Sequence, residues 1–262
     1  MIARLHLVEI AEEPWVPATL RDLLTESLQF GITRFGFYDA VAPRLAEVLR
    51  RAGSGRVVDL CSGGSGPWLS LASALEEEGV HDLEVCLTDK YVNDLARKRL
   101  EQHGDARLAY SARSVDATEV PDDLQGTRTL FTSLHHFAPE EARRVLGAAR
   151  REQVPICVFE FTERSIGSLV AATLVPFAML FTTLVMRPLT WQRLALTYLV
   201  PLIPLCSWWD GVVSSLRSYR PEELEALVSD LGGDDYTSEA GRICAAGMQP
   251  TITYLIGAPT GS

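Results

Sequence analysis

The chain has 262 residues, of which 47% are hydrophobic and 22% charged, and this is the balance of an ordinary globular protein with room for a sizeable core. Its formal net charge of −10 argues against a nucleic-acid partner, because binding to phosphates is driven by Lys and Arg. The five cysteines have an odd count and no C-x-x-C spacing, so the sequence predicts neither a metal site nor a disulfide framework.

Two observations favour the reducing cytoplasm as the location of the protein. The cysteine usage gives no sign of an oxidised framework. Residues 1–15 contain acidic side chains and lack the long apolar stretch that is typical of a secretory signal. We therefore expect a cytoplasmic protein, with peripheral attachment to a membrane as an alternative.

The N-terminal region is predicted to be helical. Leucines recur at helical spacing in residues 17–30 and again in residues 38–52, and the sequence Gly53-Ser54-Gly55 then ends the pattern. We interpret residues 1–52 as a helical cap that precedes a core at 53–164.

From residue 53 onward, strand patterns and helix patterns alternate. Strands are expected at 56–60, 83–89, within 106–116, at 128–134 and at 154–161, and helices at 67–79, 90–104 and 139–151. This alternation predicts an α/β protein with a Rossmann-like, mostly parallel sheet and helices on both faces. A surface helix at 218–233 and a terminal strand at 252–259, expected to be antiparallel, complete a closing region at 221–262 in a single 262-residue domain.

The segment 165–220 breaks the alternation and is predicted to be a helical, apolar insertion after the fifth strand. Residues 165–186 carry no charge, and 194–209 form a second apolar run. A lid over a hydrophobic ligand, a membrane-associated segment and a transmembrane hairpin all fit this pattern. Pro176 and the shortness of the second run favour the lid over the spanning hairpin.

The stretch VVDLCSGGSGPW, residues 57–68, is the strongest candidate for a ligand site. Ligands of open parallel sheets bind beyond the carboxyl ends of the strands, and glycines there remove the side chains that would block them. The turn lacks the lysine of a P-loop, and its glycines do not fit the G-x-G-x-x-G spacing of dinucleotide-binding proteins. A tight turn without a ligand is the structural alternative.

The turn from Asp59 to Gly66 resembles the first motif of the class I S-adenosylmethionine-dependent methyltransferases, broadly [DE]-x-G-x-G-x-G. Cys61 and Ser65 stand in the outer glycine positions. Cysteine in the first of these positions is similar to the ubiquinone/menaquinone-biosynthesis methyltransferases. The resemblance covers residues 53–164 and implies S-adenosyl-L-methionine as the cofactor.

The resemblance also implies roles for residues at successive strand ends. Asp59 would anchor the turn or the amino-acid part of the cofactor, and Gly63 would lie beneath the ligand. Asp89 would accept hydrogen bonds from the ribose hydroxyls, unless it caps the following helix. Asp116 and Ala117 would lie near the adenine amino group. The other expected cofactor-binding residues are Cys61, Ser62, Gly64, Lys90 and Ser133.

His135 and His136, in FTSLHHFAPEE after the fourth strand, are the candidate catalytic bases. Histidine has a suitable pKa for removing a proton from an acceptor, although paired histidines here also order the loop. The sequence gives no basis for choosing between the two. The stretch lacks the [DNS]-P-P-[YFW] element of methyltransferases that modify nucleic-acid bases, which favours a hydrophobic small molecule as the partner, with oxygen preferred over nitrogen or carbon as the acceptor.

Five residues are candidates for contacts with the acceptor, and each also has a structural interpretation. Trp15 would otherwise pack on the helices outside the sheet, and Asp210 would otherwise cap a helix. Glu160 would otherwise be a solvated loop carboxylate. The five candidates are Trp15, Tyr38, Glu160, Trp209 and Asp210.

Two other functions remain open at this stage. A cofactor-dependent enzyme of this kind would catalyse cyclisation or rearrangement of a natural product without transferring a methyl group. A binding protein would use the apolar insertion to engage a membrane or a protein partner. The sequence predicts no particular oligomeric state.

Overall fold

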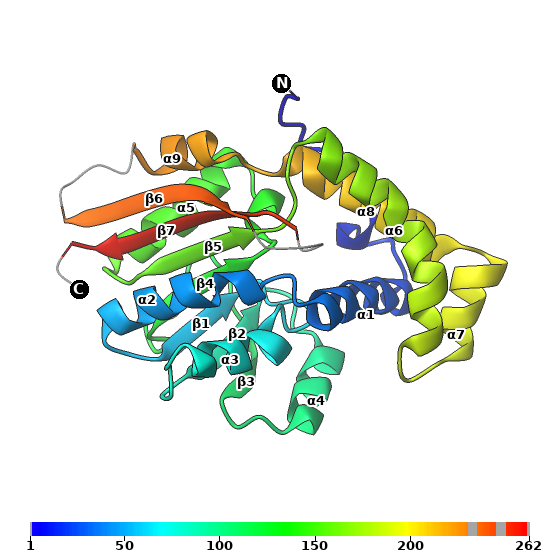
Figure 1. Ribbon diagram of the computed structural model, residues 1–262, viewed down its shortest axis with the longest axis horizontal. Coiled ribbons are helices and arrows are strands. Elements are labelled where there is room, and N and C mark those ends of the chain that lie inside the picture. Colours follow the sequence, from blue (N-terminus) through cyan, green and yellow to red (C-terminus); the bar gives the residue numbers. More distant parts are fainter. Residues whose placement is uncertain (1, 230–234, 245–249, 261–262) are drawn as a thin grey trace.

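A seven-stranded sheet forms the centre of the computed structural model, which describes residues 2–229, 235–244 and 250–260 (Figure 1). The strand order is β3-β2-β1-β4-β5-β7-β6. The first five strands are parallel, whereas β7 runs antiparallel to both β5 and β6, which confirms the predicted fold class. The strands are β1 (Arg56–Leu60), β2 (Glu84–Asp89), β3 (Leu108–Ser114), β4 (Thr127–Phe131), β5 (Ile156–Glu160), β6 (Tyr236–Ile243) and β7 (Ile252–Pro259).

Helices cover both faces of the sheet because neighbouring strand residues point to opposite sides. Val57 belongs to the hydrophobic cluster of one face and Val58 to that of the other. The first cluster also takes residues from α2 (Ala42–Ala52), α3 (Trp68–Glu77) and α4 (Asp94–His103). The second takes residues from α5 (Pro139–Arg151) and α9 (Pro221–Ser229).

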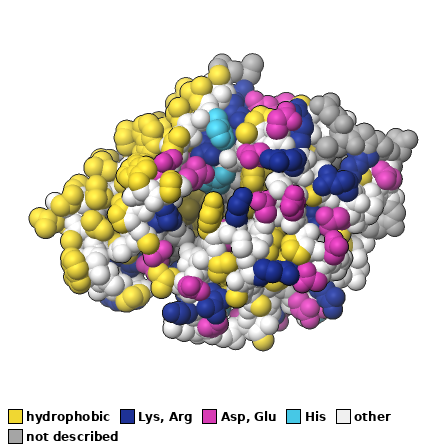
Figure 2. Space-filling model, turned by 180° about the vertical axis from the view of Figure 1, so that it is seen from behind, with side chains coloured by type: hydrophobic (Ala, Val, Ile, Leu, Met, Phe, Trp, Pro, Cys, Tyr) yellow, Lys and Arg dark blue, Asp and Glu magenta, His cyan; other side chains and the backbone are white. Residues whose placement is uncertain are grey.

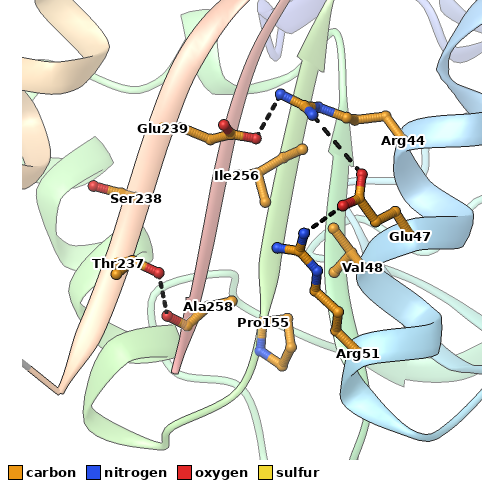
Figure 3. A pocket seen from close by; sticks show the side chains of 10 residues that line it. All are labelled: Arg44, Glu47, Val48, Arg51, Pro155, Thr237, Ser238, Glu239, Ile256 and Ala258. Carbon is orange, nitrogen blue, oxygen red and sulfur yellow. Dashed lines mark hydrogen bonds and ion pairs between the residues drawn. The ribbon is translucent and has the colours of Figure 1, made fainter. Parts of the chain in front are cut away.

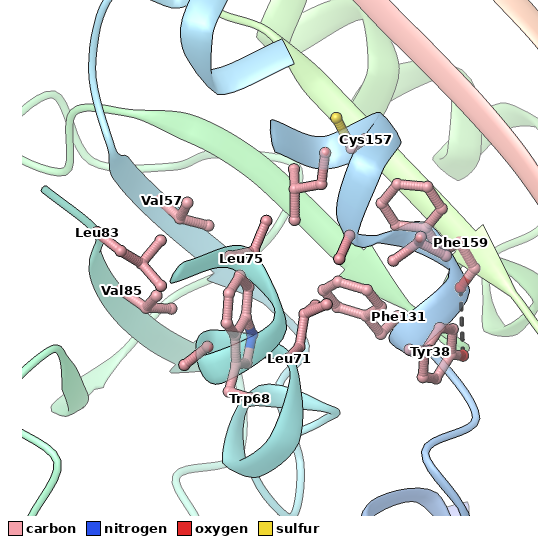
Figure 4. Packing of buried hydrophobic residues seen from close by; sticks show 14 of the residues in the cluster. Tyr38, Val57, Trp68, Leu71, Leu75, Leu83, Val85, Phe131, Cys157 and Phe159 are labelled. Carbon is pink, nitrogen blue, oxygen red and sulfur yellow. Dashed lines mark hydrogen bonds between the residues drawn. The ribbon is translucent and has the colours of Figure 1, made fainter. Parts of the chain in front are cut away.

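Aromatic packing fixes the start of α3 against the sheet (Figure 4). The fully buried Trp68 meets Phe131 edge to face, with ring centroids 5.6 Å apart. Phe131 in turn stacks on Phe159 of β5 at 5.4 Å. Because Trp68 directly follows the turn after β1, this packing holds the carboxyl end of the turn in place.

A group of helices extends from one side of the sheet (Figure 1). It contains α1 (Ala18–Phe35), α6 (Ile166–Val185), α7 (Trp191–Leu194), the π-helix η4 (Ala195–Leu199) and α8 (Leu202–Arg217). A small cluster joins α1 to the others, with Leu20 and Leu24 packed near Met179 and Ile203. Residues 165–209 are called the apolar lobe below.

The structure refines several predicted boundaries. The second apolar run, 194–209, is divided because Val200 is extended ahead of Pro201, as expected for a residue before proline, and the helices on either side are bent by 72°. The fourth strand ends at Phe131, and its predicted last residue lies in the short helix η3 (Leu134–His136). Residues 230–233 of the predicted surface helix lie outside the described residues. The sequence did not locate β6, in which no side chain is fully buried.

Candidate active site

The predicted site residues meet at the carboxyl ends of the parallel strands. Strand β1 lies between β2 and β4, so the chain reverses its order across the sheet there. This is the switch point at which open α/β sheets bind ligands. The turn at residues 59–66, called the glycine turn below, follows β1 at this position.

Asp59 is the internal anchor of the glycine turn. Its buried carboxylate accepts a hydrogen bond from the Thr129 hydroxyl at 2.6 Å and another from the Ser62 hydroxyl at 2.5 Å. Thr129 is the cross-strand neighbour of Asp59 on β4. Burial raises the pKa of Asp59 to about 7, although both hydroxyls act in the opposite direction. The carboxylate thus ties the turn to the sheet, which is one of the two roles expected for it.

The backbone of the glycine turn leaves one side bare. Gly63 has a φ of +49°, and a Cβ placed on it would meet no atom within 4 Å. Cys61 and Ser65 also have positive φ, 57° and 100°, a conformation that costs a non-glycine residue roughly 1–2 kcal/mol. On its other side the turn meets α1, because a Cβ on Gly64 would lie 2.9 Å from Cγ2 of Thr25.

Asp89, at the end of β2, borders the bare side of the turn. One carboxylate oxygen accepts the Gly63 amide at 2.9 Å, and the other accepts the Tyr91 amide at 2.8 Å. The Tyr110 hydroxyl donates to the Gly63 carbonyl at 3.0 Å. Burial raises the pKa of Asp89, although these backbone bonds and the nearby His136 lower it.

The cap of the helix that follows β2 is Asn93. Its side-chain oxygen accepts the Ala96 amide at 3.0 Å and so begins α4. The structural alternative for Asp89, that it caps this helix, is therefore wrong. Asp89 keeps its carboxylate at the glycine turn.

Lys90 and Asp116 connect the ends of β2 and β3. The Lys90 ammonium lies 2.8 Å from an Asp116 carboxylate oxygen, and the Thr118 amide and hydroxyl donate to the other oxygen. These contacts, led by Lys90, lower the pKa of Asp116 to about 2. Ala117 beside it is buried. The position predicted to lie near the adenine is thus formed by the Lys90–Asp116 ion pair beside the buried Ala117.

Glu160, at the end of β5, organises the loop that carries the histidines. One of its oxygens accepts the backbone amides of Ser133, Leu134 and His135 at 2.8–3.3 Å. The other lies 2.7 Å from Nδ1 of His135. Glu160 is buried, so it is neither the solvated carboxylate nor the substrate contact that the sequence suggested. It anchors the loop.

His135 is enclosed between two carboxylates. Nδ1 faces Glu160, and Nε2 lies 3.4 Å from an oxygen of Glu9. Burial lowers the pKa of His135, but attraction to Glu160 and Glu9 outweighs it and raises the pKa to about 10. A histidine that is already protonated has no lone pair with which to accept another proton. His135 is therefore poorly suited to be the base.

His136 has a different environment because its side chain is partly exposed. Its ring lies 4.2 Å from that of His135, and Nδ1 is hydrogen-bonded to the Glu12 carboxylate. Burial raises the pKa of Glu12, but His136 and Arg217 outweigh it and lower this pKa to about 2. An ionised Glu12 fixes Nδ1 as the donor nitrogen and leaves Nε2 as the proton acceptor.

Arg217 of α8 completes this group, and sequence reasoning missed it together with Glu9 and Glu12. Its guanidinium lies 2.7 Å from Glu12 and donates to the His135 carbonyl at 3.2 Å and the His136 carbonyl at 2.8 Å. Glu9 and Glu12 precede residue 17, where the helical leucine pattern begins. The six residues Glu9, Glu12, His135, His136, Glu160 and Arg217 are called the histidine cluster below.

Three members of the histidine cluster have the composition of a metal site. Within the described residues, ligand atoms of Glu9, His135 and His136 all lie within 4.8 Å of one another. However, Arg217 lies 3.5 Å from Glu9, and the raised pKa of His135 supplies a second positive charge. These cations already pair with the carboxylates of the cluster, so the arrangement is better described as an ion-pair network.

No family model and no curated protein sequence matches the chain, but solved structures do. A candidate O-methyltransferase from Nostoc punctiforme PCC 73102 superposes with a TM-score of 0.51 at 15% identity, covering 98% of this chain and 64% of its own. The plantazolicin methyltransferase BamL, solved with a desmethylplantazolicin analogue and S-adenosylhomocysteine, gives a TM-score of 0.53 at 10% identity, covering 93% and 98%. The chain has the class I methyltransferase fold.

Within this fold, the chain spans just under two thirds of the Nostoc protein and almost all of BamL. Figure 2 shows histidine side chains at the border between the apolar lobe and the charged surface of the sheet half.

Tyr38, a candidate for contact with the acceptor, lies in the core. Its side chain is fully buried, and its hydroxyl is bonded to the Thr132 hydroxyl. Trp15 is 71% exposed and donates to Glu13, so it packs neither on the outer helices nor over the sheet edge.

Trp209 and Asp210 hold the N-terminal segment instead of an acceptor group. The Trp209 indole donates to the Val8 carbonyl at 2.9 Å. Asp210 accepts the amides of Ile10 at 2.6 Å and Ala11 at 3.1 Å, which caps η1 (Ile10–Glu12) rather than the predicted helix. Burial raises its pKa to about 6. Both residues therefore position Glu9 and Glu12 indirectly.

A cavity of about 310 Å³ lies away from these residues (Figure 3). It is formed between α2 and strands β6 and β7, with ion pairs of Arg44 and Arg51 along one wall. Pro155, which precedes β5, also lines it, so the cavity lies toward the amino end of that strand. Ligands of parallel sheets bind at the opposite edge.

Proposed function

We propose that the protein transfers a methyl group from S-adenosyl-L-methionine to an oxygen atom of a hydrophobic small molecule. One observation carries the proposal: a bare glycine turn, hydrogen-bonded to the Asp89 carboxylate, at the switch point of a class I methyltransferase fold. Cys61 occupies the first glycine position of the motif, as a cysteine does in the ubiquinone/menaquinone-biosynthesis methyltransferases, and we include this similarity in the proposal.

The residues around the turn fit the cofactor chemically. Open space beside Gly63 admits a ligand against the backbone, where a side chain would fill it. Each Asp89 oxygen accepts one backbone amide and keeps lone-pair capacity for the vicinal hydroxyls of a ribose. Next to Asp89, Asp116 provides a polar side chain and Ala117 an apolar one. When bound, the cofactor supplies an electrophilic methyl group on a sulfonium.

His136 is the proposed base. Glu12 holds its Nδ1, so Nε2 takes the proton of an acceptor hydroxyl while Arg217 fixes the backbone of the pair. His136 lies in η3, which follows β4, and β4 pairs with β1, so the proposed base lies at the same sheet edge as the glycine turn. His135, Glu160 and Glu9 act as positioning residues, since they orient the loop without offering a free proton acceptor.

The proposed acceptor is hydrophobic and uncharged. The apolar lobe borders the histidine cluster through α8, and residues 165–209 contain no Asp, Glu or Lys. A net charge of −10 disfavours nucleic acid. A base near the transferred methyl group favours a phenol-like acceptor, because the acceptor hydroxyl must lose its proton.

Calorimetry with S-adenosylmethionine, followed by product mass analysis on a panel of phenols, tests the proposal. We expect saturable heat and a product heavier than the acceptor by one methylene unit. A product of unchanged mass would favour cyclisation or rearrangement. Absence of heat would contradict cofactor binding altogether.

A further inference from the structure

Helix α6 exposes an almost wholly apolar surface. Its 20 residues contain no charged side chain, its most apolar window has a mean hydropathy of 2.0, and only 17% of that window is buried. By length and composition α6 is able to cross a membrane. Phe177 and Phe181 are 62% and 74% exposed. At 100° per residue, the exposed large side chains from Leu180 round to Val175 span roughly 220° of the helix.

The exposed apolar surface continues beyond α6 through the rest of the lobe (Figure 2). Trp191 at the start of α7 is 73% exposed, and exposed apolar side chains follow through η4 into α8. They include Tyr198, Leu199, Val200, Leu202, Leu205 and Trp208. Monomeric soluble proteins rarely leave so continuous an apolar patch in water, and such patches mark interaction surfaces.

The charges of the lobe indicate what covers this surface. Between 165 and 209 the only charged residues are Arg187 and Arg193, and Arg193 is buried in an ion pair with Glu26. Arg187 is exposed and lies close in the chain to the exposed Trp191. In a protein of net charge −10, the lobe therefore presents a face to which its own residues contribute no carboxylate and a single exposed cation. That face suits an anionic membrane surface, where Trp and Arg are also common.

We propose that the apolar lobe embeds in one leaflet of a bilayer that contains anionic lipid. Both ends of the lobe return to the fold, α6 following β5 and α8 leading to α9, and α8 holds the histidine cluster through Arg217. Insertion along one leaflet leaves these contacts intact. The exposed arc of α6 covers more than half of its circumference. Lipid surrounds such an arc, whereas a second copy of the chain covers only one side of a helix.

Flotation of the full chain with vesicles of phosphatidylcholine, with and without phosphatidylglycerol, tests this proposal without any methyl donor. We expect the chain to float, more strongly with phosphatidylglycerol. The double variant F177Q/F181Q should reduce the floated fraction about tenfold, because it places two amides in the leaflet. The matched control L28Q/L95Q changes two exposed leucines outside the lobe and should float like the unaltered chain.

Arg187→Gln should remove the preference for phosphatidylglycerol while leaving flotation on phosphatidylcholine. Failure of the unaltered chain to float, or equal flotation of F177Q/F181Q, would overturn the proposal. A concentration-dependent dimer in sedimentation, abolished by F177Q/F181Q and accompanied by no flotation, would assign the surface to a second copy instead. Because no cofactor is present, these results are independent of the proposed methyl transfer.

Discussion

At the carboxyl edge of the sheet, the glycine turn is held by neighbouring strands, whereas the histidine cluster is held by the N-terminal segment and α8. Thr129 and Asp89, which fix the turn, lie on strands that pair directly with β1. The histidines instead depend on Glu9 and on Arg217, which are separated by 208 positions and meet only because α8 docks the N-terminal segment. The two halves of the site are therefore separable.

Cofactor binding and proton removal should therefore respond to different substitutions. The contacts of Asp59 and Asp89 keep the turn in place without the N-terminal segment. The orientation of His136 requires Glu12, and hence the segment that Asp210 and Trp209 fasten to α8. The experiments below alter one half and measure the other.

The largest effect is expected for His136→Ala. Loss of a general base lowers turnover by about 10²- to 10⁴-fold. The affinity for S-adenosylmethionine, measured by calorimetry, should stay within about twofold because the turn is untouched. His103→Ala, at the exposed end of α4, is the matched control. Full turnover by the His136 variant would reject this residue as the base.

Glu160→Ala should destabilise the protein by about 3–5 kcal/mol, because it leaves the buried His135 charge without its nearest partner. Urea unfolding measures the change in the free energy of unfolding. Glu163→Ala removes a partly exposed carboxylate that lies 3.2 Å from Arg242, and should cost less than about 1 kcal/mol. Equal costs for the two variants would contradict the anchoring role of Glu160.

Asp89→Ala should weaken binding of S-adenosylmethionine by roughly a hundredfold. Two hydrogen bonds to a charged acceptor, at about 1.5 kcal/mol each, account for this factor. Asp94→Ala, which removes an exposed carboxylate five residues away, should change the affinity little. Turnover at saturating cofactor should fall far less than in the His136 variant. Unchanged affinity would remove Asp89 from the cofactor site.

The stability of the protein should also depend on pH. His135 has a pKa of about 10 in the folded protein against an ordinary value of 6.5, so the folded state holds a proton that the unfolded state loses. The stabilisation is complete below pH 6.5 and should disappear as the pH rises toward 10. Urea unfolding across this range measures the slope, and His135→Gln should flatten it. A slope that the substitution leaves unchanged would show that His135 is not the group responsible.

The sequence was sufficient to predict features that are determined within short segments of the chain. Strand periodicity, the bare turn and the carboxylates at strand ends are set within short segments, so Asp59 and Asp89 were placed correctly at the sheet edge. Glu9 and Arg217 gave no local signal, because their partners lie far along the chain. Tyr38 was misplaced for the same reason: its burial depends on Thr132 and Phe131, which periodicity near residue 38 does not reveal.

Hydrogen exchange of the intact chain, with and without S-adenosylhomocysteine, measures whether the glycine turn and Asp89 form the cofactor site. We expect slower exchange of the amides at 61–66 and 89–91, because the bare turn and the Asp89 carboxylate hold the ligand. Unchanged exchange at both segments, with protection instead around the cavity between α2 and β6, would contradict it.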